Sequence, residues 1–318
     1  MLCPAPAGGT AGPARPAGPL VLLGPTASGK TAVSLEVARR LPGAEIVVVD
    51  SMQVYRGMDI GTAKPTSAER AAVPHHLVDL VEPHEEFTVS DFQDAARAAL
   101  VGIAARGGIA VVVAGTGLYL RALLDGLDLP GRYPGVRAGL DAEPDTVALH
   151  RRLAALDPLA ATRMEPTNRR RVVRALEVCI GSGRRFSSFG PGLATYPEVA
   201  FHQVGLSWDR AVLDRRIEAR YRHQLAAGFL EEVRALHGGA EPLSRTARQA
   251  LGYKELLDHV AGDMPFDEAL DLALRRTRRF ARRQERWFRR DPRAHWVPGG
   301  DNPVEVAERV LRDWRGCD

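Results

Sequence analysis

The stretch Gly24-Pro-Thr-Ala-Ser-Gly-Lys-Thr31 decides the fold of this chain. It fits the pattern G-x-x-x-x-G-K-[ST], in which glycines let backbone N–H groups close around phosphate oxygens. An apolar run at residues 20–23 precedes it, and residues 30–41 follow with the spacing of an amphipathic helix. Because the motif lies between a strand and a helix, it predicts a phosphate-binding loop, with Lys30 as a mobile cation and a Thr31 hydroxyl for Mg²⁺.

The rest of the N-terminal half repeats this alternation. Apolar runs at 45–49 and 109–113 predict two further strands, and an alanine-rich helix is expected at 91–106. The pattern predicts an α/β fold, a P-loop NTPase-like parallel sheet flanked by helices. Ligands of such sheets bind where the strands end, which here means residues 24–31, 50–53 and 115–117.

The pattern changes after residue 121. The following stretch is mainly helical, rich in arginine and interrupted by glycine and proline, until a strand-like run returns at 199–206. We therefore expect an inserted helical domain at 122–190, and a core domain made of 19–121 and 191–318 with a helical C-terminal part. Residues 1–18 are mostly Ala, Gly and Pro, and we expect a disordered tail there.

Composition excludes several classes of protein. With 318 residues and 45% hydrophobic residues, the chain has an ordinary globular mix. No apolar run approaches the roughly 18–20 residues of a membrane helix. Three cysteines lie far apart, at Cys3, Cys179 and Cys317, which argues against a disulfide framework and a zinc module. We expect a cytoplasmic protein.

The charge is uneven. Only three of the 43 basic residues are lysines, at positions 30, 64 and 254. The formal net charge of +4 combines a net of +6 at 151–185, a net of +8 at 275–293, and −10 over the remainder. Two basic regions on an acidic body favour a polyanionic partner, although solvated helix faces would give the same pattern.

Asp50 is the carboxylate that follows the second strand, beside the phosphate loop. From its position it could hold a metal, accept a proton or cap the next turn. The third strand ends in Val113-Ala114-Gly115-Thr116, without the acid that nucleotide hydrolases use for Mg²⁺. That absence, together with the lack of an Asn-Lys-x-Asp motif, argues against a motor or a switch GTPase.

The chain resembles the tRNA dimethylallyltransferase (tRNA isopentenyltransferase) family, bacterial type. The matching stretches run in order over almost all of the chain after residue 19: GPTASGKT (24–31), VDSMQVYRGMDIGTAKP (49–65), PHHLVDLVEP (74–83), FTVSDF (87–92), AGTGLYLRALLDGL (114–127), RRVVRALEV (170–178) and RQALGYKEL (248–256). The stretch beside the phosphate loop is far more specific than the loop alone. No segment resembles the zinc finger that eukaryotic relatives often add.

The resemblance implies a reaction. A dimethylallyl group would pass from dimethylallyl diphosphate to the exocyclic N6 of the adenosine that follows the anticodon in tRNA. The phosphate loop would then bind the diphosphate leaving group, and Mg²⁺ near Thr31 would offset its charge. Asp50 would accept the proton of the amine, and we expect a monomer.

The resemblance also assigns residues. Asp50 and Thr116 are the expected catalytic residues, and Lys64 has no implied role. Diphosphate binding falls to Gly24, Pro25, Thr26, Ala27, Ser28, Gly29, Lys30, Thr31 and Arg220, with Thr31 also expected at the metal. The residues expected to contact tRNA are Asp50, Ser51, Met52, Gln53, Thr116, Arg137, Arg170, Arg171, Arg174, Gln249, Gly252, Tyr253 and Lys254.

Three other functions share part of this pattern. A small-molecule kinase would share the phosphate loop and the sheet, but it explains neither the basic insertion nor the Asp50–Gln53 stretch. A non-catalytic RNA-binding protein would explain the charge, but would show no turnover. A related enzyme that prenylates free adenylate would be active on AMP rather than on tRNA.

Overall fold

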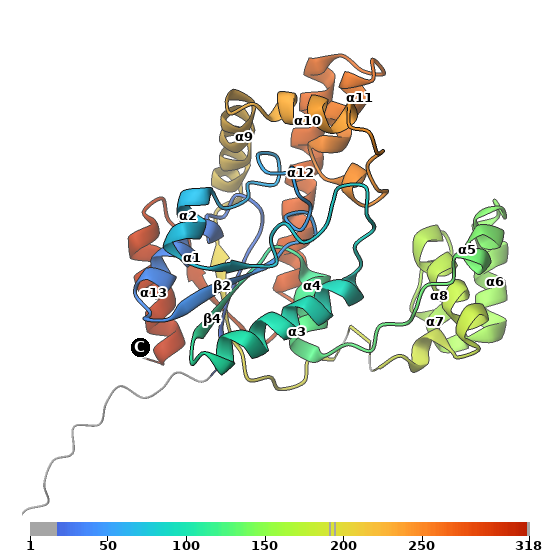
Figure 1. Ribbon diagram of the computed structural model, residues 1–318. Helices are drawn as coiled ribbons and strands as arrows, with labels where there is room; N and C mark the ends of the chain where they lie inside the picture. Colours follow the sequence, from blue (N-terminus) through green and yellow to red (C-terminus); the bar gives the residue numbers. More distant parts are fainter. Residues whose placement is uncertain (1–17, 191, 194, 317–318) are drawn as a thin grey trace, which may run out of the picture. The chain divides into compact units, whose positions relative to one another are not determined.

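The computed structural model describes residues 18–190, 192–193 and 195–316, so the tail expected at 1–18 lies, apart from Gly18, outside the described residues. The chain divides into two compact units. The core unit comprises Met1–Leu120 and Val199–Asp318, and the insertion comprises Arg121–Glu198. Figure 1 shows the chain coloured along its length, and each unit is described by itself below.

The core unit contains a six-stranded sheet in the order β3-β2-β4-β1-β5-β6, and all of its strand pairs are parallel. Helices flank it, which confirms the predicted architecture (Figure 1). The strands are β1 (Leu20–Leu23), β2 (Ala44–Val49), β3 (His75–His76), β4 (Ile109–Ala114), β5 (His202–Ser207) and β6 (Ala294–Pro298). The sequence did not predict β3 and β6. Strand β3 has only two residues, and the residues of β6 are half-buried or exposed, whereas those of the inner strands β1 and β4 are mostly buried.

The helices of the core unit cover the sheet and extend beyond it. They are α1 (Lys30–Arg39), α2 (Ser67–Ala72), α3 (Val89–Ala105), α9 (Arg210–Ala226), α10 (Phe229–His237), η2 (Ala247–Gln249), α11 (Tyr253–Val260), α12 (Phe266–Phe288) and α13 (Pro303–Arg315). Helix α4 (Gly117–Asp125) begins in the core unit and ends in the insertion. The main hydrophobic core joins α1 and α13 to one face of the sheet, through residues such as Leu22, Val37, Val113, Val204 and Val310.

The register of the sheet determines where the site lies. Ala114 at the end of β4 is the partner of both Leu23 at the end of β1 and Val49 at the end of β2. The three strands therefore stop at the same level. Because they are parallel, the segments that follow them meet at one edge, as the sequence predicted.

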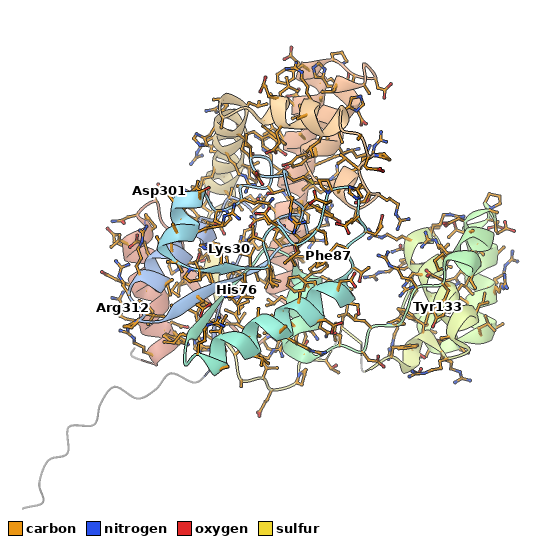
Figure 2. All side chains as sticks on the ribbon, viewed as in Figure 1. Lys30, His76, Phe87, Tyr133, Asp301 and Arg312 are labelled. Atoms are coloured by element: carbon orange, nitrogen blue, oxygen red, sulfur yellow. The ribbon has the colours of Figure 1, made fainter. Side chains whose placement is uncertain are left out.

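The insertion is a helical unit with its own small core. It contains α5 (Pro134–Asp141), α6 (Thr146–Leu156), α7 (Pro158–Thr162), α8 (Arg169–Ser182) and η1 (Phe186–Ser188). Its core includes Leu149, Leu153, Val172 and Leu176. A Cβ at Gly181 would lie 2.0 Å from the ring of Tyr133, which Figure 2 labels, so only glycine allows this close packing.

Polar side chains begin the helices of the insertion. Asp145 accepts hydrogen bonds from the backbone of Val147 and Ala148, and Asn168 accepts one from Arg171. Asp157 caps α7 and also accepts two hydrogen bonds from Ser187, at 2.7 and 2.8 Å. These caps satisfy helix N–H groups that have no partner within the helix. Among the described residues of the whole chain, no helix has the length and apolar character needed to cross a membrane.

Candidate active site

The phosphate loop connects β1 to α1 with the geometry that anion binding needs. Gly29 and Ala27 have positive φ angles of 86° and 63°, and a Cβ at Gly24 would lie 2.9 Å from the Ser28 hydroxyl. Gly29 precedes α1 and provides no side-chain cap, and the first turn has no acidic residue. The amide groups at this helix start therefore face the loop without a competing carboxylate, which favours binding of a phosphate.

Two cationic side chains approach this loop from different elements. The Lys30 ammonium, at the first residue of α1 (Figure 2), donates to the carbonyls of Gly24 and Pro25, both at 2.8 Å. Burial lowers the pKa of Lys30 to about 7, against the opposing effect of Asp50, and Arg220 lowers it further. Arg220 comes from α9 and donates to the Thr26 hydroxyl at 3.1 Å. Burial also lowers the pKa of Arg220. A bound polyanion would offset the cost of placing both cations here.

A third cation at the loop, Arg216, was missed by sequence reasoning. It lies one turn before Arg220 on α9, donates to the carbonyl of Ala27 at 2.9 Å and stacks on the ring of Trp208. It also pairs with Asp301. The spacing of four residues places both arginines on one face of α9, and that spacing was the available signal.

Asp50 follows β2 at the same edge of the sheet. One of its carboxylate oxygens accepts the backbone N–H groups of Met52 at 2.8 Å and Gln53 at 3.3 Å, which fixes the orientation of the group. The other oxygen would lie 3.3 Å from a Cβ at Gly115, so glycine allows β4 to end close to this carboxylate. Thr116 accepts the backbone N–H of Ser51 through its hydroxyl, at 3.3 Å. The structure thus brings both expected catalytic residues together.

Gln284 of α12 joins the two halves of this edge and was also missed from the sequence. Its amide oxygen accepts the Thr26 N–H at 2.9 Å, and its amide nitrogen donates to the Gly115 carbonyl at 2.6 Å. A single side chain therefore connects the phosphate loop to the end of β4. Nothing in the arginine-rich sequence around it marks a buried glutamine as special.

The segment from Gln53 to Lys64 forms the next wall of the site. Gln53 donates through its side chain to the carbonyls of Thr62 and Ala63, at 3.1 and 3.3 Å. On the other side, the Glu232 carboxylate accepts the N–H groups of Asp59, Ile60 and Gly61. Arg220 donates to the carbonyl of Gly61 at 3.4 Å. This turn therefore positions an arginine that also reaches the phosphate loop.

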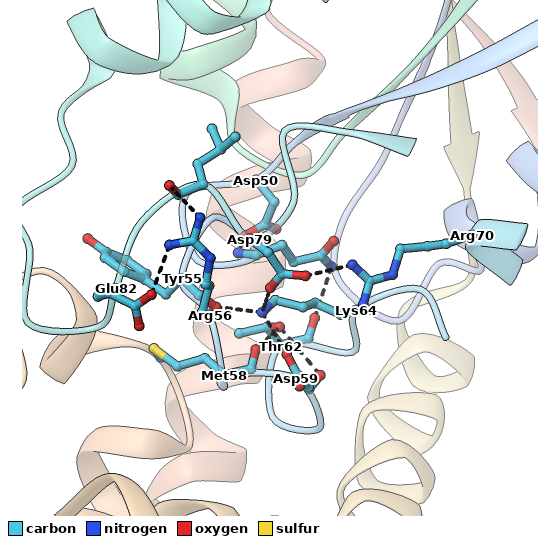
Figure 3. Close-up of polar contacts among 12 residues, drawn as sticks. Asp50, Tyr55, Arg56, Met58, Asp59, Thr62, Lys64, Arg70, Asp79 and Glu82 are labelled. Atoms are coloured by element: carbon cyan, nitrogen blue, oxygen red, sulfur yellow. Dashed lines mark hydrogen bonds and ion pairs between the residues drawn. The ribbon is translucent and has the colours of Figure 1, made fainter. Parts of the chain in front are cut away.

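Lys64 anchors this segment from inside (Figure 3). Its side chain is 2% exposed, and its ammonium donates to the Tyr55 carbonyl at 2.5 Å and to Asp59 and Asp79 at 2.6 Å each. Asp79 also receives a hydrogen bond from Arg70 at 2.6 Å. Burial raises the pKa of Asp79, but the hydrogen bonds from Lys64 and Arg70 outweigh it and lower the pKa overall. Lys64 therefore has a structural role that the sequence did not indicate.

The phosphate loop, Asp50 and Arg220 line one cavity of about 630 Å³ within the core unit. It is lined by Thr26 to Thr31, Asp50, Gln53, Thr62 to Pro65, Arg216, Arg220 and Gln284, and by the apolar residues Ile46, Val48, Val113 and Phe280. The cavity thus combines a phosphate cradle, a carboxylate and an apolar wall. Such a site can hold a phosphorylated ligand with a short hydrocarbon part beside a group that accepts a proton.

The expected contact segment 249–254 is only partly at the surface. Gln249 is exposed, and Lys254 is half-exposed and pairs with Asp258 at 3.3 Å. Tyr253 is fully buried, and its hydroxyl donates to Glu232 at 2.5 Å. Burial and the nearby Glu232 raise the pKa of Tyr253. A direct RNA contact by the Tyr253 side chain therefore does not fit this structure: the ring supports the segment from beneath. Gly252, with φ 86°, is buried as well.

In the insertion, the four expected arginines divide into two pairs. Arg137 and Arg174 both lie against Glu177, at 3.9 and 2.9 Å, and Arg174 also donates to the Pro130 carbonyl. Arg170 and Arg171 are exposed at the start of α8, and within the described part of the chain no side-chain partner is recorded for either. The second pair is therefore the one presented to solvent.

Helix α12 carries the other basic region. Arg275, Arg279 and Arg286 are exposed and share one side of the helix, since they follow each other at intervals of four and seven residues. The opposite side, which includes Ala273, Thr277, Ala281 and Gln284, is buried. This side of the helix packs into the core unit while these arginines face outward.

Comparison with known proteins identifies the family. Residues 53–291 match the IPP transferase family and residues 19–76 match the isopentenyl transferase family. The tRNA dimethylallyltransferases of Kineococcus radiotolerans and Geobacter metallireducens are 50% and 45% identical to this chain. The alignments cover 93% and 87% of this chain, and 96% and 91% of those proteins.

Solved structures agree with this result. A tRNA isopentenylpyrophosphate transferase from Bacillus halodurans superposes with a TM-score of 0.69 at 35% identity, over 95% of this chain and 98% of that one. A eukaryotic dimethylallyltransferase described as acting on tRNA gives a TM-score of 0.75 at 25% identity, over 89% of this chain and 74% of that one. The parallel sheet with its phosphate loop is thus the P-loop-like fold of these enzymes, and the chain belongs to the tRNA dimethylallyltransferase family.

Proposed function

We propose that this protein transfers a dimethylallyl group from dimethylallyl diphosphate to N6 of the adenosine on the 3′ side of the anticodon in tRNA, releasing diphosphate. The observation that carries the proposal is that the Asp50 carboxylate shares one cavity with the phosphate loop, Lys30 and Arg220. One end of this cavity suits a leaving group of high negative charge, and the other suits an amine that must lose a proton.

The donor end follows from the charges around the loop. In the reaction, the bond between the allylic carbon and a diphosphate oxygen breaks, and negative charge accumulates on the diphosphate. The loop amides, Lys30, Arg220 and Arg216 are hydrogen-bond donors aimed at that position, and such preorganised donors stabilise developing charge. The apolar side chains of Ile46, Val48 and Val113 offer a surface for the five-carbon group.

A magnesium ion fits the donor set at this end. The Thr31 hydroxyl lines the cavity at the start of α1, and hydroxyl and phosphate oxygens are hard ligands of the kind that Mg²⁺ prefers. Thr31 would hold the ion together with the diphosphate oxygens, and the ion would offset the charge of the leaving group.

The acceptor end depends on Asp50. The adenine amine is a weak nucleophile because its lone pair is delocalised into the ring, and it becomes neutral after bond formation only by losing a proton. The Asp50 oxygen that faces Gly115 is free of the two backbone N–H groups held by the other oxygen, so it can accept this proton. Thr116 and Ser51 then help to orient the base, which has to leave its stack to enter the cavity.

We further propose that the insertion, Arg121–Glu198, binds the tRNA. Arg170 and Arg171 would contact the phosphate backbone, and Arg137 and Arg174 would do so while held against Glu177. Gln249 and Lys254 are the accessible members of the second segment, and Met52 and Gln53 lie beside Asp50. The exposed arginines of α12 extend the basic surface of the core unit. We also propose that the enzyme acts on tRNA in the cytoplasm, as a monomer.

The test is an assay with purified protein, unmodified tRNA, dimethylallyl diphosphate and Mg²⁺, with the product nucleosides analysed by mass spectrometry. The expected product is adenosine bearing one dimethylallyl unit at N6, formed without ATP. Consumption of ATP would indicate a small-molecule kinase, and prenylation of AMP but not tRNA would indicate an enzyme of free adenylate. RNA binding without any turnover would indicate a non-catalytic protein.

A further inference from the structure

A cluster of two histidines and an aspartate lies at the opposite edge of the sheet from the cavity. His202 is the first residue of β5, His295 is the second residue of β6, and Asp313 lies near the end of α13. In the parallel register His295 is the partner of Val204, so the two histidines lie two residues apart on neighbouring strands and share one face. Val204 packs in the same core as α13, which identifies that face as the one α13 covers.

The three side chains converge on one point. Asp313 directs one carboxylate oxygen to His202 Nε2 at 2.6 Å and the other to His295 Nδ1 at 3.4 Å. The two rings are 5.0 Å apart at an angle of 71°. Among the described residues, one potential ligand atom from each of these three side chains lies within 4.8 Å of the other two.

This donor set is typical of one class of ion. Two imidazole nitrogens and a carboxylate oxygen bind zinc and similar transition metals, whereas Mg²⁺ prefers oxygen ligands. In a tetrahedral site with zinc–ligand bonds of about 2.0–2.2 Å, neighbouring donor atoms are about 3.3 Å apart. The contact between Asp313 and His295 already has this spacing.

Small side-chain movements would complete the geometry. The contact between His202 and Asp313 is a hydrogen bond, and it must open slightly for an ion to enter. The His295 side chain is 57% exposed, so its ring can rotate towards the other two without moving a strand. Solvent on that side can supply the remaining ligand.

We propose that His202, His295 and Asp313 bind a transition-metal ion of the zinc class. The site is separate from the Mg²⁺ position at the phosphate loop, because it lies at the amino ends of β5 and β6 and not at the carboxyl ends of the strands. A bound ion links the C-terminal helix α13 to two strands of the sheet. The proposal does not depend on the transfer reaction.

The experiment uses the untagged full chain, freed of metals by a chelator and then titrated with Zn²⁺ alone or Co²⁺ alone. The expected result is one ion per chain, visible absorption of the Co²⁺ form typical of a four-coordinate site, and an unfolding temperature raised by a few degrees at saturating Zn²⁺. Mg²⁺ at the same concentration leaves the unfolding temperature unchanged.

Two variants and one control locate the site. His295→Ala removes an exposed ligand with little effect on folding, and it should weaken Zn²⁺ binding by more than about tenfold. Asp313→Asn should do the same and serves as the second variant. His237→Ala, which removes an exposed histidine from α10, should bind like the wild type. Equal Zn²⁺ affinity for wild type and His295→Ala, or an equal loss in His237→Ala, would overturn the proposal.

Discussion

The cavity of the core unit and the arginine surface of the insertion hold their charges in different ways. Around the cavity, Asp50, Lys64 and Arg220 are held by hydrogen bonds to backbone groups and to neighbouring side chains, and little of this machinery can move alone. At the start of α8, Arg170 and Arg171 extend into solvent. Under the proposed function, this difference means that one unit would preorganise the chemistry, while the other would offer adaptable electrostatic contacts to the tRNA.

The largest expected effect concerns the groups that are held in place around the cavity. Asp50→Asn keeps the size of the side chain but removes its ability to accept a proton. We expect kcat to fall by roughly 10²–10⁴, the range typical of general base catalysis, with little change in tRNA affinity. Single-turnover kinetics and filter binding measure the two quantities. If the variant turned over as fast as the wild type, Asp50 would serve only to cap the turn that leads to Met52 and Gln53.

Lys30→Met removes the cation at the head of α1 and keeps its aliphatic chain. We expect kcat/KM for dimethylallyl diphosphate to fall by roughly 10²–10³, as when one donor to a developing anion is lost. Binding of tRNA alone should be unchanged, which is measured in the absence of the donor. If donor kinetics stay normal while tRNA binding falls, the loop has another ligand.

Lys64→Met tests how far the fixed network extends from the reacting groups. It removes the hydrogen bonds of a buried cation, whereas Asp59 is 56% exposed and Asp79 keeps its pair with Arg70, so we expect the free energy of unfolding to fall by about 1.5–3 kcal/mol. Because the 53–64 segment also positions Arg220, the KM for dimethylallyl diphosphate should rise about tenfold. Lys254→Met is the matched control, since this exposed pair with Asp258 contributes only about 0–1 kcal/mol.

The exposed arginines of the insertion are tested by replacing both Arg170 and Arg171 with alanine in one variant. We expect the KM for tRNA to rise several-fold and kcat to stay close to wild type. Each lost phosphate contact should reduce the slope of log affinity against log salt by about 0.7–0.9. Parallel salt curves for the variant and the wild type would mean that these two side chains do not contact phosphates.

The smallest expected effect concerns the insertion alone. Hydrogen bonds from Ser187 and Ala160 lower the pKa of the buried Asp157 carboxyl, despite the opposing effect of burial. Because the pKa of Asp157 is lower in the folded protein than in the unfolded chain, where it is about 4, its ionised form stabilises the insertion at pH values above about 4. This stability is lost as the pH falls through the pKa of the folded protein. Asp157→Asn replaces one of the two accepting oxygens by a donor, so it should cost about 0.5–1.5 kcal/mol at neutral pH and flatten this acid dependence.

Urea unfolding of the wild type and of Asp157→Asn, at neutral and at acidic pH, measures the difference in stability between them. A spectroscopic probe in the insertion follows the unfolding. An acid dependence as steep in Asp157→Asn as in the wild type would assign it to other carboxylates.

The sequence predicted those features of the fold and the site that depend on a local pattern of residues. Residues 24–31 defined the loop, and the apolar runs before Asp50 and Gly115 placed both at one edge, because parallel strands align their ends. It did not predict β3, whose two residues, His75 and His76, are too few for a pattern, or Gln284, whose partners lie more than 160 positions away. Tyr253 was expected to contact tRNA because it belongs to a family motif, and a motif reports which residues occur together but not which of them face solvent.

The hydrogen bonds between the Lys30 ammonium and the carbonyls of Gly24 and Pro25 have a consequence for the end of the catalytic cycle. A cation that has acceptors of its own exchanges partners when an anion arrives, and exchanges them back when the anion leaves. The protein without product is thereby stabilised, which limits how tightly diphosphate is retained. The same two carbonyls that keep Lys30 in place would thus speed the release of product and the start of the next turnover.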